Sequence, residues 1–357
     1  MIIGDLRRAL GTPVSCAGTW RPAPPGSGGS PGSAASPGVF ATGVAFLLAR
    51  DEGRPAATIA TELAQRLRPL DWVSEATVTG GGYVTVTVTA DALARLAVRV
   101  AQAGPACARS DALAGTALTA PAAAALASAP SWRQARERLA VTVCARLAQA
   151  AGARVTWTHD AERIAVPGSP ARPPASPGGP VAGAIAFAGA DAVTYTLARL
   201  PPGTPARLDA RLAAAHDLGN PAYAVRYAHA HAASTLRQAA DLGLDRGDAA
   251  GFQPWLLAHP CERALLGELS WLPERVGEAA RRRRPDVCAR ALEGLAGAYL
   301  DCQETCPAVR PGTGAARQVP GERAVSAATA RLWLAEAART ALCAGLGLLG
   351  VTAPDRL

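Results

Sequence analysis

The fold of the C-terminal half is decided by one segment, Asn220–Ala230, which reads NPAYAVRYAHA. Asparagine favours the N-cap position of a helix and proline favours its first turn, so Asn220 and Pro221 predict a helix start. Tyr223 and Tyr227 are one helical turn apart and therefore share a face of that helix. The segment predicts a long helix, over 221–242, that begins sharply and carries an aromatic face.

Helical patterning continues on both sides of this segment, from residue 182 to residue 357. Apolar residues recur there at intervals of three and four. The predicted helices are 191–199, 207–217, 221–242, 252–268, 271–282, 286–304 and 323–348. We therefore expect a bundle built almost entirely of helices.

The region before residue 104 has a different pattern, in which helical and alternating segments follow one another. The glycines at 80–82 separate two alternating segments and indicate a hairpin. The predicted elements are helices at 40–50, 56–68 and 90–103 and strands at 72–79 and 83–89. A helix at 132–151 and a strand at 154–158 follow.

These elements predict an α+β N-terminal small domain, a short α/β segment and a mostly α-helical C-terminal bundle. Proline, glycine and serine are concentrated at 21–38 and 167–180, and such tracts cannot bury enough surface to order themselves. The expected divisions are a disordered, low-complexity segment at 1–39, the α+β domain at 40–103, the α/β segment with its linker at 104–181, and the helical domain at 182–357.

Composition limits the classes of function. Hydrophobic residues make up 49% and charged residues 18% of the 357 residues, which is typical of a globular protein. The net charge is +8, which favours an anionic partner. All basic residues are arginine, so chemistry that needs a lysine ammonium group is excluded. We found no run of about twenty uncharged apolar residues and no apolar signal core, and we expect a cytoplasmic protein without membrane contact.

Eight cysteines are scattered along the chain without a CxxC pair. In a chain of this length the scatter favours reduced thiols over a disulfide framework. Cys302 and Cys306 are four residues apart, but no second pair with zinc-ligand spacing accompanies them. The expectation from sequence is therefore no metal.

Several segments resemble arginyl-tRNA synthetases. Asn220–Ala230 resembles the NPxYxVxYAHAR segment that opens the family's anticodon-binding domain, and Gly345–Leu357 (GLGLLGVTAPDRL) resembles its terminal GLxLLGVxAPExM. Tyr299–Cys306 and Arg331–Ala344 fall where the family has FHxFYxxC and ARLxLxxAxxxVL. Gly189–Asp209 resembles the family's entry to this domain. The resemblance implies a DALR-type anticodon-binding domain.

The N-terminal region resembles the family's added N-terminal domain, which grips the tRNA elbow in synthetases. Phe40–Thr42, Ile59–Ala60 and Gly80–Tyr83 are similar to the YATN, IA and AGPGF landmarks of that domain. The implied arrangement is a tRNA-elbow-like domain at one end of the chain and an anticodon-binding domain at the other.

The middle of the chain departs from the family. Counting back from Ala150–Gly152, the family's HxGH signature falls on Ser131–Gln134, which reads SWRQ. In the family those histidines stabilise the phosphate that arginine attacks, and its second ATP loop depends on lysine. Only residues 159–181 stand where most of the nucleotide-binding fold would be. The comparison implies a degenerate, truncated catalytic domain with no catalytic residue and no cofactor.

The resemblance also implies the residues that contact RNA. Tyrosines on 221–242 could stack on splayed anticodon-loop bases. For Tyr223 this interpretation and a core position stay equally open, whereas for Tyr227 a core position is favoured. His229 matches the family's histidine, and His231 replaces its arginine. The candidate set is Asn220, Tyr223, Arg226, Tyr227, His229, Arg237, Arg281, Arg282, Arg283, Leu357, Tyr83 and Arg54.

Simpler explanations remain beside these assignments. Asn220 is expected to cap its helix and to do nothing else. Arg226 and Arg237 are expected to be solvated surface residues unless they reach phosphates. The arginine run at 281–284 could complement a helix dipole, contact the tRNA backbone, or do both.

Three functions are consistent with these observations. The first is a non-catalytic arginyl-tRNA synthetase paralogue that binds tRNA, with tRNA-Arg as the expected ligand. Such a protein could present tRNA to a tRNA-modifying or charging enzyme, regulate charging, or store tRNA, and the sequence does not choose among these roles. The second is an arginine–tRNA ligase subunit, or part of a split synthetase, that needs a partner. The third is a protein-interaction module that has lost RNA binding.

Overall fold

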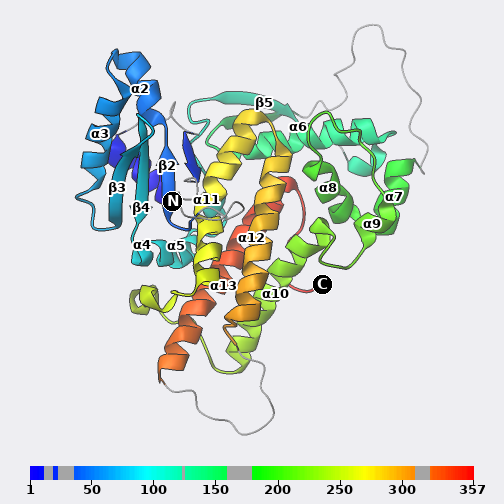
Figure 1. Ribbon diagram of the computed structural model, residues 1–357. Coiled ribbons are helices and arrows are strands. Elements are labelled where there is room, and N and C mark those ends of the chain that lie inside the picture. The colour runs from blue at the N-terminus through cyan, green and yellow to red at the C-terminus, as the bar shows by residue number, and fades with distance from the viewer. Residues whose placement is uncertain (12–18, 23–35, 123–124, 159–178, 310–321) are drawn as a thin grey trace.

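The computed structural model describes residues 1–11, 19–22, 36–122, 125–158, 179–309 and 322–357. They form a small sheet domain, a two-stranded α/β unit and a helical bundle (Figure 1), which is the predicted fold class. The strands are β1 (Trp20–Pro22), β2 (Val39–Thr42), β3 (Val73–Thr79), β4 (Tyr83–Val88), β5 (Ala117–Pro121) and β6 (Arg154–Thr158). Most of the tract at 21–38 and of the linker at 167–180 lies outside the described residues.

The longer helices follow the predicted pattern in most of the chain. They are α1 (Ile2–Leu10), α2 (Val44–Glu52), α3 (Ala56–Leu67), α4 (Ala90–Ala94), α5 (Leu96–Ala103), α6 (Trp132–Ala150), α7 (Pro180–Ala188), α8 (Ala190–Arg199), α9 (Ala210–Ala214), α10 (Pro221–Asp241), α11 (Pro260–Arg282), α12 (Pro285–Thr305) and α13 (Glu322–Leu349).

The N-terminal domain is an antiparallel sheet of order β1-β2-β4-β3 with α2 and α3 packed against it. The β3–β4 hairpin has the predicted glycines at its tip, where Gly80 and Gly81 have φ of 55° and 76°. Only glycine adopts such angles without strain, which explains this turn. A Cβ on Gly82 would lie 2.8 Å from the ring of Phe46. The third glycine therefore lets the hairpin backbone pack closely against this ring.

Two expectations for this domain were wrong. Residues 40–42 belong to β2, because Phe40 and Ala41 pair with β4, and the helix begins only at Val44, whose N–H donates to Thr42 Oγ1 (3.2 Å). Within 1–39, expected to be disordered, Ile2–Leu10 is a helix whose Leu6 is fully buried. Ile2, Ile3, Leu6 and Leu10 form the buried apolar face of this short helix.

The middle of the chain retains one β-α-β unit. Strands β5 and β6 are parallel and are connected through α6, and both strands contact this helix. Ser131 accepts a hydrogen bond from the backbone N–H of Gln134 (3.3 Å) and so caps α6. Residues 159–178, which stand where the sequence suggested a shortened region, are outside the described part of the chain.

The C-terminal bundle and the N-terminal domain share one hydrophobic core. Phe40 of the sheet packs on Trp271 of α11 with ring centroids 5.3 Å apart, and α5 packs along α13. Within α13, Ser326–Leu349 is long and apolar enough to cross a membrane, but 61% of its apolar window is buried in the protein. This burial is the one expected of a core helix. Because α13 packs along α5, it holds the N-terminal domain and the bundle in fixed positions relative to each other.

Two bundle expectations were also wrong. A break was predicted between 268 and 271, yet α11 runs without interruption through Pro273, although proline lacks an N–H donor. Buried apolar residues on both sides of Pro273, such as Leu272 and Val276, keep one continuous apolar face. The helix predicted at 207–217 is confined to Ala210–Ala214, because Ala215 is extended.

Candidate nucleic-acid interface

A column of aromatic rings runs along α10. His216, in the preceding loop, stacks on Tyr223 with centroids 5.4 Å apart and an interplanar angle of 15°. Tyr223 stacks on Tyr227 at 5.7 Å and 21°, and Tyr227 contacts His231 at 5.9 Å. His216 is exposed and the other three rings are half-buried. The two tyrosines are therefore neither core residues nor free surface residues.

The inner end of the column is fixed in the core. His231 Nδ1 lies 3.1 Å from the hydroxyl oxygen of Tyr299, a ring that is fully buried on α12. Thr235 Oγ1 lies 3.5 Å from the same hydroxyl and donates to the carbonyl of His231. Burial lowers the pKa of His231, so the imidazole is held neutral more strongly than in a free chain. A neutral, anchored ring gives the column a fixed position.

Asn220 performs the capping role that its sequence position predicts. Its Oδ1 accepts the N–H of Ala222 (3.1 Å). Its amide nitrogen donates to the carbonyls of Ala213 (3.0 Å) and Ala215 (2.7 Å). Side-chain oxygen and nitrogen are thus both engaged, and they hold the loop that carries His216 against the start of α10.

Arg226 lies on the side of α10 that faces α8. Its guanidinium pairs with Asp191 (3.4 Å), and Asp191 also accepts the backbone N–H of Thr352 (3.0 Å) and its hydroxyl. Arg226 is therefore part of a junction between α10, α8 and the C-terminal tail. The structure places this arginine in an internal contact and not in the open.

His229 and Arg237 extend this attachment of the tail. His229 is buried, with Nδ1 3.0 Å from the carbonyl oxygen of Pro354. Arg237 donates to the carbonyl of Asp355 (3.0 Å). Burial lowers the pKa of His229, and the Pro354 contact opposes this in part. Beyond these contacts Leu357 is 56% exposed, beside α10 and accessible to a ligand.

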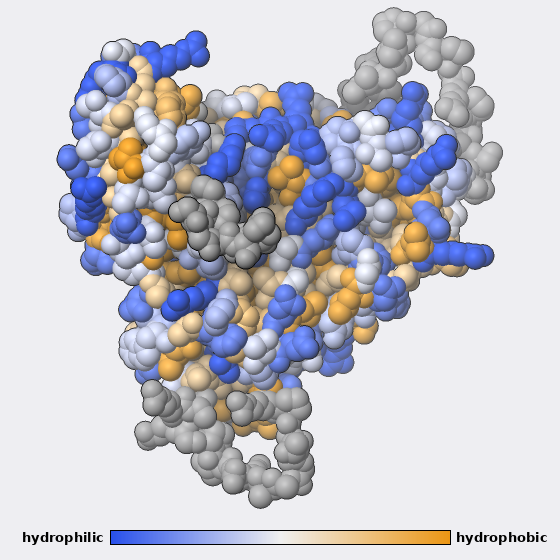
Figure 2. Space-filling view, viewed as in Figure 1, coloured by the Kyte–Doolittle hydropathy of each residue, from blue (hydrophilic) through white to orange (hydrophobic). Residues whose placement is uncertain are grey.

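The arginine run ends α11 and turns into α12. Arg281 is half-buried near Glu274 (4.0 Å), and Arg282 pairs with Glu278 (3.2 Å). Arg283 is exposed, adopts a left-handed conformation with φ of 51°, and forms no ion pair with the described residues. Figure 2 shows hydrophilic side chains gathered around the upper ends of α11 and α12. Of the three predicted residues, Arg283 is the one whose charge is uncompensated.

The two candidates in the N-terminal domain lie apart from α10. Tyr83 is 49% exposed and packs edge-on against Phe46, with centroids 5.0 Å apart. Arg54 pairs with Glu52 (3.0 Å) and with Glu62. The structure therefore groups the candidates into three places: the α10 face with the tail, the α11–α12 turn, and the N-terminal domain. His216 was missed because its contact with Tyr223 depends on the loop that Asn220 holds, which no local pattern shows.

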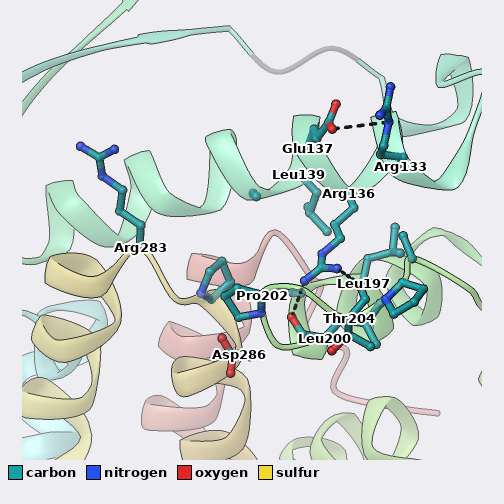
Figure 3. Close-up of a pocket in the computed structure, with 15 residues that line it drawn as sticks. Arg133, Arg136, Glu137, Leu139, Leu197, Leu200, Pro202, Thr204, Arg283 and Asp286 are labelled. Carbon is teal, nitrogen blue, oxygen red and sulfur yellow. Dashed lines mark hydrogen bonds and ion pairs between the residues drawn. The ribbon is translucent and has the colours of Figure 1, made fainter.

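A cavity of about 510 Å³ lies beside the start of α6, between that helix and the loop after α8 (Figure 3). Arg136 donates to the carbonyl of Leu200 (3.2 Å) and to those of Pro201 and Thr204. Arg283 points away from the other labelled residues in Figure 3. The guanidinium of Arg136 is occupied by these carbonyls, so it holds the cavity wall in place.

Comparisons with known proteins match both ends of the chain. The model of the DALR anticodon binding domain matches residues 225–357, and that of the arginyl tRNA synthetase N terminal domain matches residues 33–88. The chain is arginyl-tRNA synthetase-like. The helical bundle that carries the aromatic column and the tail is thus its anticodon-binding-type domain, and the sheet domain is its N-terminal-type domain.

Relatives of this synthetase-like chain include the arginine–tRNA ligases of Paenarthrobacter aurescens, 40% identical, and of Micrococcus luteus, 39% identical, each over 173 residues. Each match covers 48% of this chain and 30% of the relative, so the chain matches under a third of those proteins. The structure of Thermus thermophilus arginyl-tRNA synthetase aligns with a TM-score of 0.62 at 16% identity, over 99% of this chain and 98% of that one. This likeness extends the shared fold across the whole chain.

Proposed function

We propose that this arginyl-tRNA synthetase-like protein binds tRNA through the α10 face and the C-terminal tail, and that tRNA-Arg is its preferred tRNA. We also propose that the protein does not itself charge the tRNA. The observation that carries the proposal is the partly exposed column formed by His216, Tyr223, Tyr227 and His231. Each unstacked base has a π-face, and aromatic platforms bind such bases without requiring a particular sequence. The relatives are arginine–tRNA ligases, which supports tRNA as the ligand.

Charge supports the same ligand. The chain carries a net charge of +8, and Arg283 is exposed without an ion pair among the described residues. Phosphate contacts release counterions, so binding should weaken steeply as salt rises. The proposal places a cytoplasmic tRNA partner on the bundle and uses the tail, with Leu357 at its end, as a second contact.

The absence of charging rests on the sequence. At the start of α6, Ser131 caps the helix where the family has a histidine, and no lysine is available for the ATP loop. A carboxylate activated as an adenylate needs charge at the phosphate, which serine and glutamine do not supply. We expect no ATP–pyrophosphate exchange dependent on arginine, by this chain alone.

One observation favours a second function, a protein-interaction module. Three of the predicted phosphate-contacting arginines are used internally: Arg226 by Asp191, Arg237 by the Asp355 carbonyl, and Arg282 by Glu278. A surface whose arginines are already bonded to carboxylates and carbonyls of the protein attracts RNA less strongly. The two functions differ in their response to RNA, and one titration separates them.

That titration follows the fluorescence anisotropy of labelled tRNA-Arg, a second tRNA and an unstructured RNA of equal length, at low and near-physiological salt. Preference for tRNA, with affinity falling as salt rises, supports the proposal. Equal, weak binding to all three RNAs supports the protein-interaction module. Exchange of pyrophosphate into ATP in the presence of arginine, measured on the same preparation, would contradict the non-catalytic part.

A further inference from the structure

A cluster of metal-ligating side chains lies away from the α10 face, where α11 begins and α12 ends. His259, Cys261 and Cys306 place one ligand atom each within 4.8 Å of one another. His259 Nδ1 lies 2.9 Å from Cys261 Sγ. Cys302 lies one turn before Cys306 on the same helix and is buried. Three potential ligands, from the start of α11 and the end of α12, therefore meet around Cys261.

The fold explains why these side chains meet. Helices α11 and α12 pack antiparallel, so the first turn of one lies beside the last turn of the other (Figure 1). His259 is the N-cap of α11 and Cys261 lies in its first turn, whereas Cys302 lies in the last turn of α12 and Cys306 ends it. The sequence did not show this group, because His259 and Cys261 come from a different helix than Cys306.

The charges around the cluster suit a bound divalent cation. Arg331 is already neutralised, because its guanidinium pairs with the buried carboxylate of Glu262 (2.8 Å). Thiolates at Cys261 and Cys306 would carry two negative charges, which balance the two positive charges of one Zn²⁺ ion.

The cluster is accessible to solvent, and the imidazole of His259 is held in place. His259 is exposed and Cys261 is half-buried, which opens the cluster to solvent on one side, while Cys302 and Cys306 close it on the other. Glu262 accepts the backbone N–H of His259 (2.9 Å) and holds the loop that carries the imidazole. Ligation by Nδ1 replaces one contact, the N–H of Cys261 (3.3 Å), and leaves the Glu262 contact in place.

We propose that His259, Cys261 and Cys306 hold a Zn²⁺ ion that joins the start of α11 to the end of α12, with a solvent molecule as its fourth ligand. Thiolates and imidazole are the ligands that select zinc, which takes four ligands in a tetrahedral arrangement. Metal binding displaces the thiol protons and couples to folding. The site stabilises the bundle at the end opposite the arginine run.

The test uses the full chain, purified in reductant, stripped with a chelator and dialysed against Zn²⁺. Metal content is measured by mass spectrometry, and Co²⁺ replacement gives the absorption of thiolate-ligated tetrahedral cobalt. We compare Cys261→Ser, Cys306→Ser and His259→Asn with Cys343→Ser, an exposed cysteine of α13. His259→Asn retains a side chain that caps helices, so α11 should still form.

The expected result is one Zn²⁺ per chain for the wild type and for Cys343→Ser, with thermal stability that rises on metal addition. The affinity for Zn²⁺ should fall by more than about 100-fold in Cys261→Ser and Cys306→Ser. This loss is larger than the loss caused by removing a residue that only hydrogen-bonds to a zinc ligand. Helical circular dichroism confirms that each variant is folded. Wild-type protein without stoichiometric zinc, or zinc unaffected by these variants, overturns the proposal. A mass lower by two hydrogens after chelation, with no zinc uptake, overturns it in favour of a Cys261–Cys306 crosslink.

Discussion

His231 Nδ1 lies 3.1 Å from the hydroxyl oxygen of Tyr299, and this contact joins the aromatic column of α10 to the core at α12. Tyr299 is fully buried and also has Thr235 Oγ1 at 3.5 Å. The rings outward of His231, Tyr227 and then Tyr223, depend on this anchor for their position. The position of the column and the stability of the core are therefore linked at a single hydroxyl group.

Tyr299→Phe removes that hydroxyl without removing the ring. We expect the free energy of unfolding to fall by about 1 kcal/mol, the usual net value of a buried hydrogen bond. Urea unfolding measures the change, with Tyr83→Phe, an exposed tyrosine of the N-terminal domain, as the control. Unchanged stability in Tyr299→Phe would show that the His231 contact contributes nothing.

Asn220→Ala removes the cap of α10 and the two amide contacts that hold the preceding loop. The expected loss is about 0.5–2 kcal/mol of unfolding free energy, the range for a lost cap. Asn220→Asp retains the capping oxygen but not the amide donor, and should be intermediate. If Asn220 instead acts by touching RNA, stability would stay constant while affinity falls, and this outcome would contradict the capping role.

The pH dependence of stability follows from two histidines. Burial lowers the pKa of His229 and His231 from the ordinary value of 6.5. The unfolded chain then binds protons at higher pH than the folded chain, so stability is complete above about pH 6.5 and is lost as the pH falls toward the folded pKa. Urea unfolding at a series of pH values from about 7.5 to 5 should show this decline. The double variant His229→Gln, His231→Gln should flatten it, and an unchanged slope would contradict the assignment.

Gly345 allows α13 to pack closely on α12. A Cβ at this position would overlap Leu292 Cδ2, and Leu292 is fully buried. Alanine gains up to about 1 kcal/mol of helix propensity, but overpacking costs about 1–3 kcal/mol. Gly345→Ala is therefore expected to lower the melting temperature.

Gly347 is the matched control, because nothing lies within 4 Å of a Cβ built there. Gly347→Ala should be neutral or stabilising by about 0.5–1 kcal/mol. A melting temperature that rises equally in both variants would show that the Leu292 contact is not tight.

Local sequence patterns predicted the elements that depend on neighbouring residues. The start of α10 follows from Asn220 and Pro221, and the hairpin follows from the glycines at 80–82. Non-local effects account for the errors. Pro273 does not break α11, because burial of its apolar face outweighs one missing N–H donor. Residues 40–42 form a strand because β4 is available to pair with them.

In the candidate site, too, local spacing was predictable from the sequence, and contacts between distant residues were not. Helical spacing placed Tyr223 and Tyr227 on one face, and the structure shows them stacked. Spacing could not show that Arg226 pairs with Asp191 or that His229 contacts Pro354, because these partners are distant in sequence. The meeting of His259 and Cys261 with Cys306 depends on the α11–α12 pairing for the same reason.

The measurement that tests the central claim most directly is the affinity of tRNA-Arg for wild type, Tyr223→Ala and Tyr223→Phe, with Trp255→Ala as a control aromatic that is 63% exposed away from the column. We predict that Tyr223→Ala weakens binding by about 5-fold to 150-fold, the range for one lost base stack of about 1–3 kcal/mol. Tyr223→Phe and Trp255→Ala should bind as the wild type does. If folded Tyr223→Ala binds as tightly as the wild type, the aromatic column is not the RNA-binding surface and the account is contradicted.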